Sequence, residues 1–193
     1  MIDGEVTTTG ANSTGIVTAG WGETTMLSGS ITTKGDNATG IYITASQRLD
    51  RVKTILSGSI TAAGHGIHIA TSTGNHEVDI SGTVNSMGTT YSALLNSGSG
   101  TGNKFTLNEG AVIIGNITNN SQSTQLAINL GQNESYAYSL GGTGIGTTTG
   151  KWSITDEDGR TPAVSENGSC VTGVFICNLC LAPSDWSKTI VSA

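Results

Sequence analysis

A short string that recurs five times along the chain is the feature that most constrains its fold. Each copy reads apolar, any residue, Gly, any residue, apolar, and the intervals between copies vary. Constant strings separated by variable intervals are typical of stacked coils with loops of different length, that is, of a solenoid. The five copies are Ile2–Val6, Leu27–Ile31, Leu56–Ile60, Ile80–Val84 and Ile113–Ile117.

Alternation within each copy predicts a β-strand with one buried face, because successive side chains of a strand point to opposite sides. We expect Leu27, Gly29 and Ile31 to share the inward face of one strand. The second apolar residues of the five copies should then stack as a core ladder at positions 6, 31, 60, 84 and 117.

A second element follows the first four copies. A glycine comes four residues after the copy, and a small residue and an aliphatic residue come next, as in Gly40-Ile41 and Gly66-Ile67. The first glycine suits a corner with positive φ, and the later pair begins another short strand. The expected corner glycines are Gly10, Gly35, Gly64 and Gly88.

Composition agrees with an all-β protein. Gly accounts for 28 of 193 residues and charged residues for 11%, so helix formers are scarce while turn and strand formers are abundant. The Leu-x-x-Leu-x-Leu spacing of leucine-rich repeats is missing. The sequence predicts a right-handed parallel β-helix of the pectin-lyase-like kind with about five to six coils. We expect the coils to occupy residues 1–145, and an end-of-helix segment with a divergent tail to occupy residues 146–193.

Several strings resemble a known family. Leu56–Thr61, Gly35–Ile41 and Phe105–Ile117 look like coils of the pertactin-like and AIDA-like passenger domains of bacterial autotransporters, and Gly150–Asp156 resembles the segment leading toward their translocator. The resemblance implies a surface-displayed stalk or adhesin of type V secretion, a virulence-associated class. It also implies a signal peptide and an outer-membrane translocator barrel in the full-length protein, located at the cell surface or outer membrane. Because the sequence shows neither and opens in mid-repeat, we expect a fragment.

The charge distribution limits the partners. The formal net charge is −6 without a basic cluster, which argues against nucleic-acid binding, and no apolar stretch is long enough for a membrane-spanning helix. The variable segments Ala45–Lys53 and Thr89–Lys104 are the expected binding loops, because solenoids usually bind through loops on one face. The candidate residues are Arg48, Arg51 and Lys53, and the partner would be a host-surface protein or a glycan.

No catalytic residue, cofactor or metal site is predicted. His65, His68 and His76 with Asp79 suggest a base and its orienter, but lone histidines on coils are more often solvated. The alternative function is a free-standing β-helix carbohydrate-active enzyme or a tailspike-like glycan-binding protein, since stacked coils could bring scattered carboxylates together.

The tail contains three cysteines, Cys170, Cys177 and Cys180. They are interpreted as small buried hydrophobes or part of a divergent tail, with a Cys177–Cys180 disulfide as one alternative. Zinc is the other alternative, although a structural zinc site needs four ligands.

Overall fold

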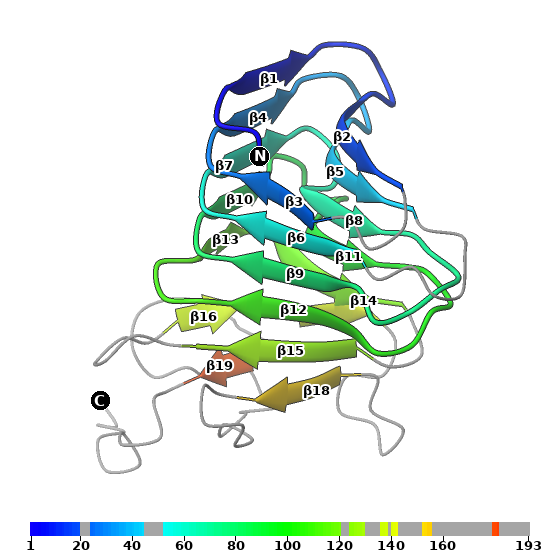
Figure 1. The fold of residues 1–193 in the computed structure, drawn as a ribbon, viewed down its shortest axis with the longest axis vertical. Coiled ribbons are helices and arrows are strands. Elements are labelled where there is room, and N and C mark those ends of the chain that lie inside the picture. The colour runs from blue at the N-terminus through cyan, green and yellow to red at the C-terminus, as the bar shows by residue number, and fades with distance from the viewer. Residues whose placement is uncertain are drawn as a thin grey trace.

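The chain forms three parallel β-sheets wound into a solenoid (Figure 1). The structure, a computed structural model, describes residues 1–19, 24–44, 52–120 and 124–129 in full. It describes the backbone of four further strands at 136–138, 140–142, 152–155 and 179–181. The described residues contain no helix, and so none that is long and apolar enough to cross a membrane. The predicted all-β parallel solenoid is confirmed.

Each turn of the solenoid contributes one strand to each sheet, so neighbouring strands in a sheet come from successive turns. The first sheet contains β1 (Glu5–Thr8), β4 (Ser30–Thr33), β7 (Ser59–Ala62), β10 (Thr83–Ser86) and β13 (Val112–Ile114). The second contains β2 (Thr14–Thr18), β5 (Thr39–Ile43), β8 (Ile67–Ile69), β11 (Ser92–Asn96), β14 (Asn116–Asn119) and β17 (Leu140–Gly142). The third contains β3 (Thr24–Leu27), β6 (Lys53–Leu56), β9 (Glu77–Ile80), β12 (Asn103–Leu107), β15 (Thr124–Ile128) and β18 (Trp152–Thr155).

Beside this stack, β16 (Tyr136–Tyr138) and β19 (Leu179–Leu181) form an antiparallel pair. The third sheet continues to β18, which pairs in parallel with β15. The division of the chain between residues 145 and 146 stays a prediction.

The core consists of aliphatic ladders, one for each sheet. Side chains at equivalent positions of successive strands lie in register and point inward, where each buried aliphatic group contributes roughly 1.5–3 kcal/mol relative to exposure. The ladders are Val6–Ile31–Ile60–Val84–Ile113, Ile16–Ile41–Ile67–Leu94–Ile117 and Leu27–Leu56–Ile80–Leu107–Ile128.

The repeated string turned out to be a corner and not a single strand. Leu27 ends β3, Ile31 lies in β4, and Gly29 is in the bend between them. Both aliphatic side chains are buried, as expected, but they belong to different sheets. The prediction that all three residues share one strand face was wrong, because a Leu-x-Gly-x-Ile spacing fits a tight corner as well as it fits an extended strand.

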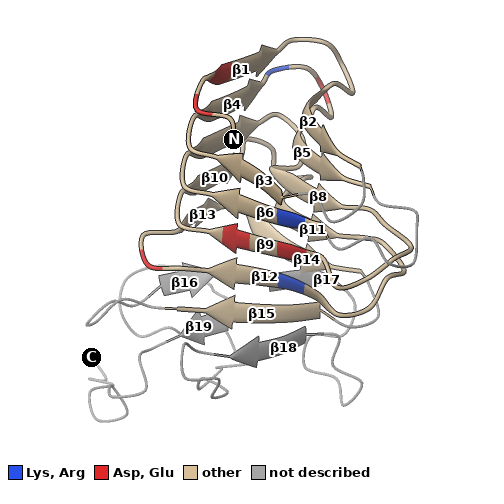
Figure 2. Ribbon diagram, in the orientation of Figure 1, with Lys and Arg blue, Asp and Glu red and all other residues tan. Residues whose placement is uncertain are grey.

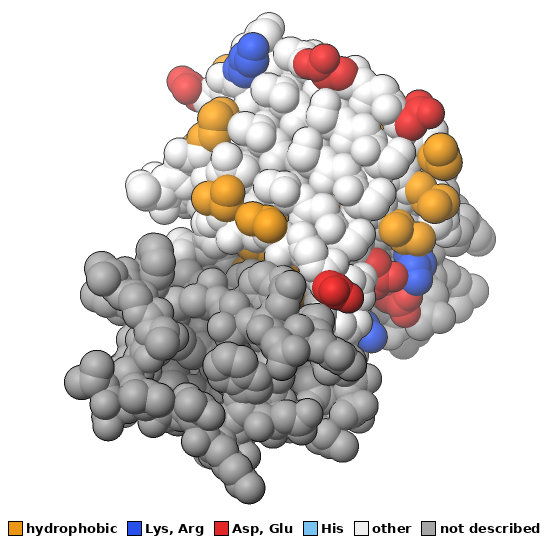
Figure 3. Space-filling model, turned by 90° about the vertical axis from the view of Figure 1, so that its left-hand side faces the viewer, with side chains coloured by type: hydrophobic (Ala, Val, Ile, Leu, Met, Phe, Trp, Pro, Cys, Tyr) orange, Lys and Arg blue, Asp and Glu red, His pale blue; other side chains and the backbone are white. Residues whose placement is uncertain are grey.

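The corner requires glycine because successive coils approach closely there. A Cβ on Gly29, Gly58 or Gly82 would overlap the carbonyl oxygen of the equivalent glycine one coil earlier, whereas a Cβ on Gly4 would meet nothing within 4 Å. Figure 3 views the molecule from the side where this corner lies and shows a broad area of uncharged polar groups and backbone, with charged side chains near its border.

The fifth copy of the string occupies a different corner. Ile113 lies in the first sheet opposite Val84, but Ile117 lies in the second sheet opposite Leu94. Gly115 turns the chain between them with φ of 119°. The predicted ladder through position 117 was therefore wrong in its last member, and Ile113 takes that place.

The prediction of positive φ at four corner glycines was also wrong. None of Gly10, Gly35, Gly64 and Gly88 has positive φ, and the left-handed residues of the first two coils are Asn12 and Asn37, both with φ of 55°. Asn tolerates this conformation better than most residues. The two side chains also stack, since Asn37 Nδ2 donates to Asn12 Oδ1 at 2.9 Å. Gly35 is needed for another reason, because a Cβ there would overlap the backbone of Gly10.

Candidate binding surface

Rings from three successive coils gather on the outer face of the second sheet. Tyr42 of β5 is the register partner of His68 of β8. The residues on either side of each are buried isoleucines, so alternation directs Tyr42 and His68 outward. His65 precedes β8, and Tyr91 precedes β11. We call these four residues, together with Ser97, the imidazole–tyrosine patch.

The rings of the patch contact one another, two pairs edge to face and one pair tilted. Centroid distances are 5.2 Å for Tyr42–His68, His65–His68 and His65–Tyr91. The interplanar angles are 78° for Tyr42–His68 and 87° for His65–Tyr91, the T-shaped geometry that ring quadrupoles favour. The four rings therefore hold one another in place across the coils.

Hydrogen bonds fix both imidazoles. The backbone N–H of Ser92 donates to His65 Nδ1 at 3.0 Å, so that nitrogen has no proton and Nε2 carries the proton of the neutral ring. His68 Nε2 and Ser97 Oγ are 2.7 Å apart. The arrangement favours neutral rings in fixed orientations.

Burial opposes protonation of both rings. It lowers the pKa of His65. It lowers the pKa of His68 to about 4, with a further contribution from repulsion by His65. Both imidazoles are therefore uncharged at neutral pH.

The low pKa of His68 makes stability depend on pH. An unfolded His has a pKa of about 6.5, so the unfolded chain binds the proton first. The neutral His68 ring contributes fully to the free energy of unfolding above about pH 6.5, and this contribution is lost as pH falls toward 4. We expect acidification from pH 7 to 4 to destabilise the wild type by about 1–2 kcal/mol more than the His68→Phe variant, allowing for solvent screening.

Urea unfolding of both proteins at pH 7 and pH 4 would measure this difference. An equal loss of stability in wild type and variant would show that His68 is not the titrating group.

The described strands around the patch lack ionic side chains. The strands of the second sheet contain no Asp, Glu, Lys or Arg. The third sheet differs, since Figure 2 shows Lys and Asp or Glu along β6, β9 and β12. The two outer faces therefore suit different partners.

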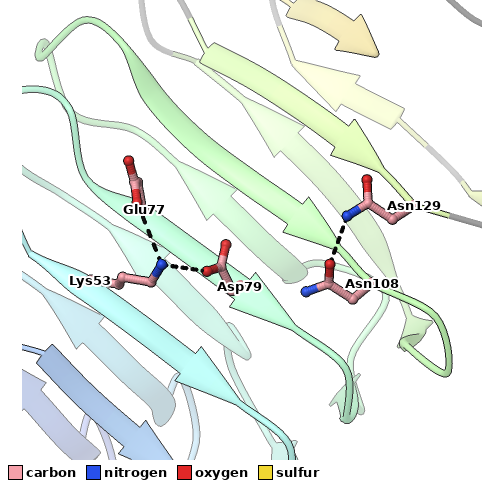
Figure 4. A network of polar contacts seen from close by, with 5 residues as sticks. All are labelled: Lys53, Glu77, Asp79, Asn108 and Asn129. Atoms are coloured by element: carbon pink, nitrogen blue, oxygen red, sulfur yellow. Dashed lines mark hydrogen bonds and ion pairs between the residues drawn. The ribbon is translucent and has the colours of Figure 1, made fainter. Parts of the chain in front are cut away.

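Lys53, one of the predicted binding residues, belongs to the charged face of the third sheet. Its Nζ lies 2.8 Å from Asp79 Oδ2 and 3.8 Å from Glu77 Oε2 (Figure 4). The hydrogen bond to Asp79 raises the pKa of Lys53. Lys53 is the first residue of β6, and its side chain forms ion pairs with residues of the neighbouring strand β9. Arg48 and Arg51 lie outside the described residues.

The prediction that Thr89–Lys104 forms one continuous loop was wrong. It contains all of β11 and the start of β12. Its Ser97–Gly100 turn packs against the previous coil, because a Cβ on Gly98 would overlap the backbone of Thr71.

We expect the Lys53 ion pairs to contribute little stability. Their side chains are 25–40% exposed, and solvent-exposed pairs contribute about 0.2–1 kcal/mol. Lys53→Met should lower the free energy of unfolding by about 0.5 kcal/mol, with exposed Lys34 changed to Met as the control. A double-mutant cycle with Asp79→Asn would isolate the pair, and a coupling energy above about 2 kcal/mol would contradict this expectation.

Of the residues suggested as a base and its orienter, the structure brings His65 and His68 into contact but does not pair His76 with Asp79. His76 is fully buried in the corner before β9, whereas Asp79 points to the outer face of β9 and binds Lys53. The expectation that lone histidines on the coils are solvated was therefore wrong for His76.

His76 satisfies polar groups inside this corner. Its Nδ1 accepts a hydrogen bond from the Val52 backbone N–H at 3.1 Å. Its Nε2 therefore carries the proton of the neutral ring and lies 3.0 Å from Thr73 Oγ1 and 3.2 Å from Thr71 Oγ1. Its backbone N–H donates to Asn103 Oδ1 at 3.1 Å. Asn103 leads into a buried network with Asn96, Thr124 and Asn119.

Two expectations concern parts of the chain described only partly. Cys170 and Cys177 lie outside the described residues, and of Cys180 only the backbone in β19 is described, opposite Ala137. The disulfide stays a prediction. Across the described ranges, no three His, Cys, Asp or Glu side chains are grouped so that they could hold a metal ion.

The described residues thus form a parallel β-solenoid with tyrosine and histidine rings gathered on one of its three outer faces. In comparisons with known proteins, no family profile, curated protein or solved structure matches the chain.

Proposed function

We propose that this chain is a non-catalytic stalk segment of a surface-displayed, adhesin-type protein of the autotransporter passenger kind. One observation carries the proposal, namely that three in-register parallel ladders run continuously through the described coils. A solenoid of this kind lengthens by adding coils and presents a regular array of outward side chains, which suits display away from a cell surface. The coil strings that resemble passenger domains, such as Leu56–Thr61, support the same reading.

The proposal includes a partner and a location. The stalk would contact a host-surface protein or glycan and would be held at the outer membrane or released from it. In the full-length protein a signal peptide and a translocator would provide secretion. Reading the gene on both sides of this coding segment tests that part, and unrelated neighbouring genes with no translocator would overturn it.

Adhesion is tested with the purified chain. Fluorescently labelled protein is titrated onto cultured epithelial cells, with the heat-unfolded chain as the control. We expect saturable binding that unlabelled protein displaces, and absence of such binding would overturn the adhesin proposal.

A parallel assay tests catalysis. The same preparation is incubated with pectin, alginate and host glycosaminoglycans, and new reducing ends or unsaturated products are measured. We expect none above the level of the unfolded control. Turnover by the folded chain would overturn the non-catalytic assignment and favour the carbohydrate-active enzyme.

A further inference from the structure

We propose that the imidazole–tyrosine patch is a binding site for a neutral oligosaccharide. This inference rests on the proposed adhesin function and deepens it by naming the contact surface and the class of ligand. The patch consists of Tyr42, His65, His68, Tyr91 and Ser97, gathered from three coils.

The first argument is the arrangement of the rings. Pyranose rings bind proteins by placing their C–H faces on aromatic side chains, and rigid aromatic anchors reduce the entropy lost on binding. Tyr42 and Tyr91 are partly exposed and are fixed by contacts to the two imidazoles. Adjacent rings lie 5.2 Å apart, so the four rings form one continuous surface across three coils.

The second argument is the supply of polar groups beside the rings. The Nε2–H of His65 is available as a donor because its Nδ1 accepts from Ser92. Among the described residues, neither tyrosine hydroxyl has a hydrogen-bond partner. Sugar sites combine such a small number of oriented polar groups with aromatic surface.

The third argument is charge. The second sheet has no ionic side chain, and both imidazoles are neutral at physiological pH. Over the described strands of this face, an anionic ligand such as a sialylated glycan or a glycosaminoglycan would lose solvation without gaining a cation. The complementary ligand is an uncharged glycan.

The fourth argument is the direction of the surface. Along the sheet, the row of side chains through Tyr42 and His68 continues to exposed Val17 on one side, whereas on the other side the register partner of His68 is the buried Leu95. Val17 is 57% exposed, so apolar surface extends past the rings. This row of side chains runs from coil to coil along the solenoid axis, so it suits a chain of several sugars that lies across successive coils.

Titration with defined oligosaccharides tests the inference. Calorimetry and NMR would be used with maltohexaose, cellohexaose and a neutral lactosamine hexasaccharide, and with the sialylated lactosamine as the anionic comparison. We expect at least one neutral probe to bind with a dissociation constant that Tyr42→Ala weakens at least tenfold. Lys53→Met, on the charged face of the third sheet, should bind within twofold of wild type, whereas Tyr42→Phe, which keeps the ring but loses the hydroxyl, should bind more weakly than wild type and more tightly than Tyr42→Ala.

Each outcome decides the matter. Absence of binding to all neutral probes, preference for the sialylated probe, or unchanged binding by Tyr42→Ala would overturn the glycan site. If Tyr42→Ala binds the neutral probes as the wild type does and still attaches to cells, the adhesin proposal stands and only the glycan site is overturned. If the wild type attaches to no cells, the adhesin proposal fails independently of the glycan result.

Discussion

Replacing Gly58 by Ala is expected to lower the free energy of unfolding by about 3 kcal/mol, whereas the same change at Gly4 is expected to cost nothing. The added Cβ at Gly58 would overlap the carbonyl oxygen of Gly29 and would lie 2.6 Å from that of Ser28. The obstructing atoms are backbone, so no side chain can rotate away.

Hydrogen bonds between coils prevent the backbone from relaxing. The N–H of Gly58 donates to the carbonyl of Leu27 at 3.1 Å, and the N–H of Ser59 donates to the carbonyl of Gly29 at 3.0 Å. Moving the coils apart to admit a methyl group would weaken these bonds and the aliphatic ladders beside them. The cost should therefore reach the upper end of the range for overpacked sites.

Gly4 is the matched control. It occupies the same position in the repeated string, but an added Cβ there meets nothing within 4 Å. Its φ is not positive, so Ala should be neutral or stabilising by up to about 0.5 kcal/mol through lower entropy of the unfolded chain. Urea unfolding of both variants measures the difference. Equal stability of the two variants would show that contact between coils does not select glycine at the corner.

Replacing His76 by Leu is expected to lower the free energy of unfolding by about 3 kcal/mol. Leucine fills much of the space but cannot accept the hydrogen bond from the Val52 N–H, and it leaves the hydroxyls of Thr71 and Thr73 without the imidazole. His76 and Val52 are both fully buried, so water cannot easily replace the lost acceptor.

His76→Asn provides the matched comparison. The Oδ1 of Asn can take the position of imidazole Nδ1, so this variant should recover about half of the loss. Urea unfolding measures stability, and amide hydrogen exchange at Val52 reports on the bond itself. Exchange at Val52 as slow in His76→Leu as in wild type would contradict the assigned role of His76.

Part of the candidate surface could be read from the sequence. Aligning Gly40-Ile41-Tyr42-Ile43 with Gly66-Ile67-His68-Ile69 places Tyr42 and His68 at the same outward position of successive strands. Nothing local indicates that Tyr91 and His65 join them, because both lie outside the strands and their positions depend on how the connections pack. Lys53 was selected for its basic neighbours, but its contacts with β9 come from the next coil.

Residue patterns alone were enough to predict an all-β solenoid and the aliphatic residues that face its interior. Both follow from local rules, since alternation and spacing decide which side of a strand each residue occupies. The positions of the corners, the place of Ile117 in the second sheet and the burial of His76 could not be predicted in this way. These features depend on contacts between coils, where close backbone approach and the pairing of buried polar groups select the arrangement.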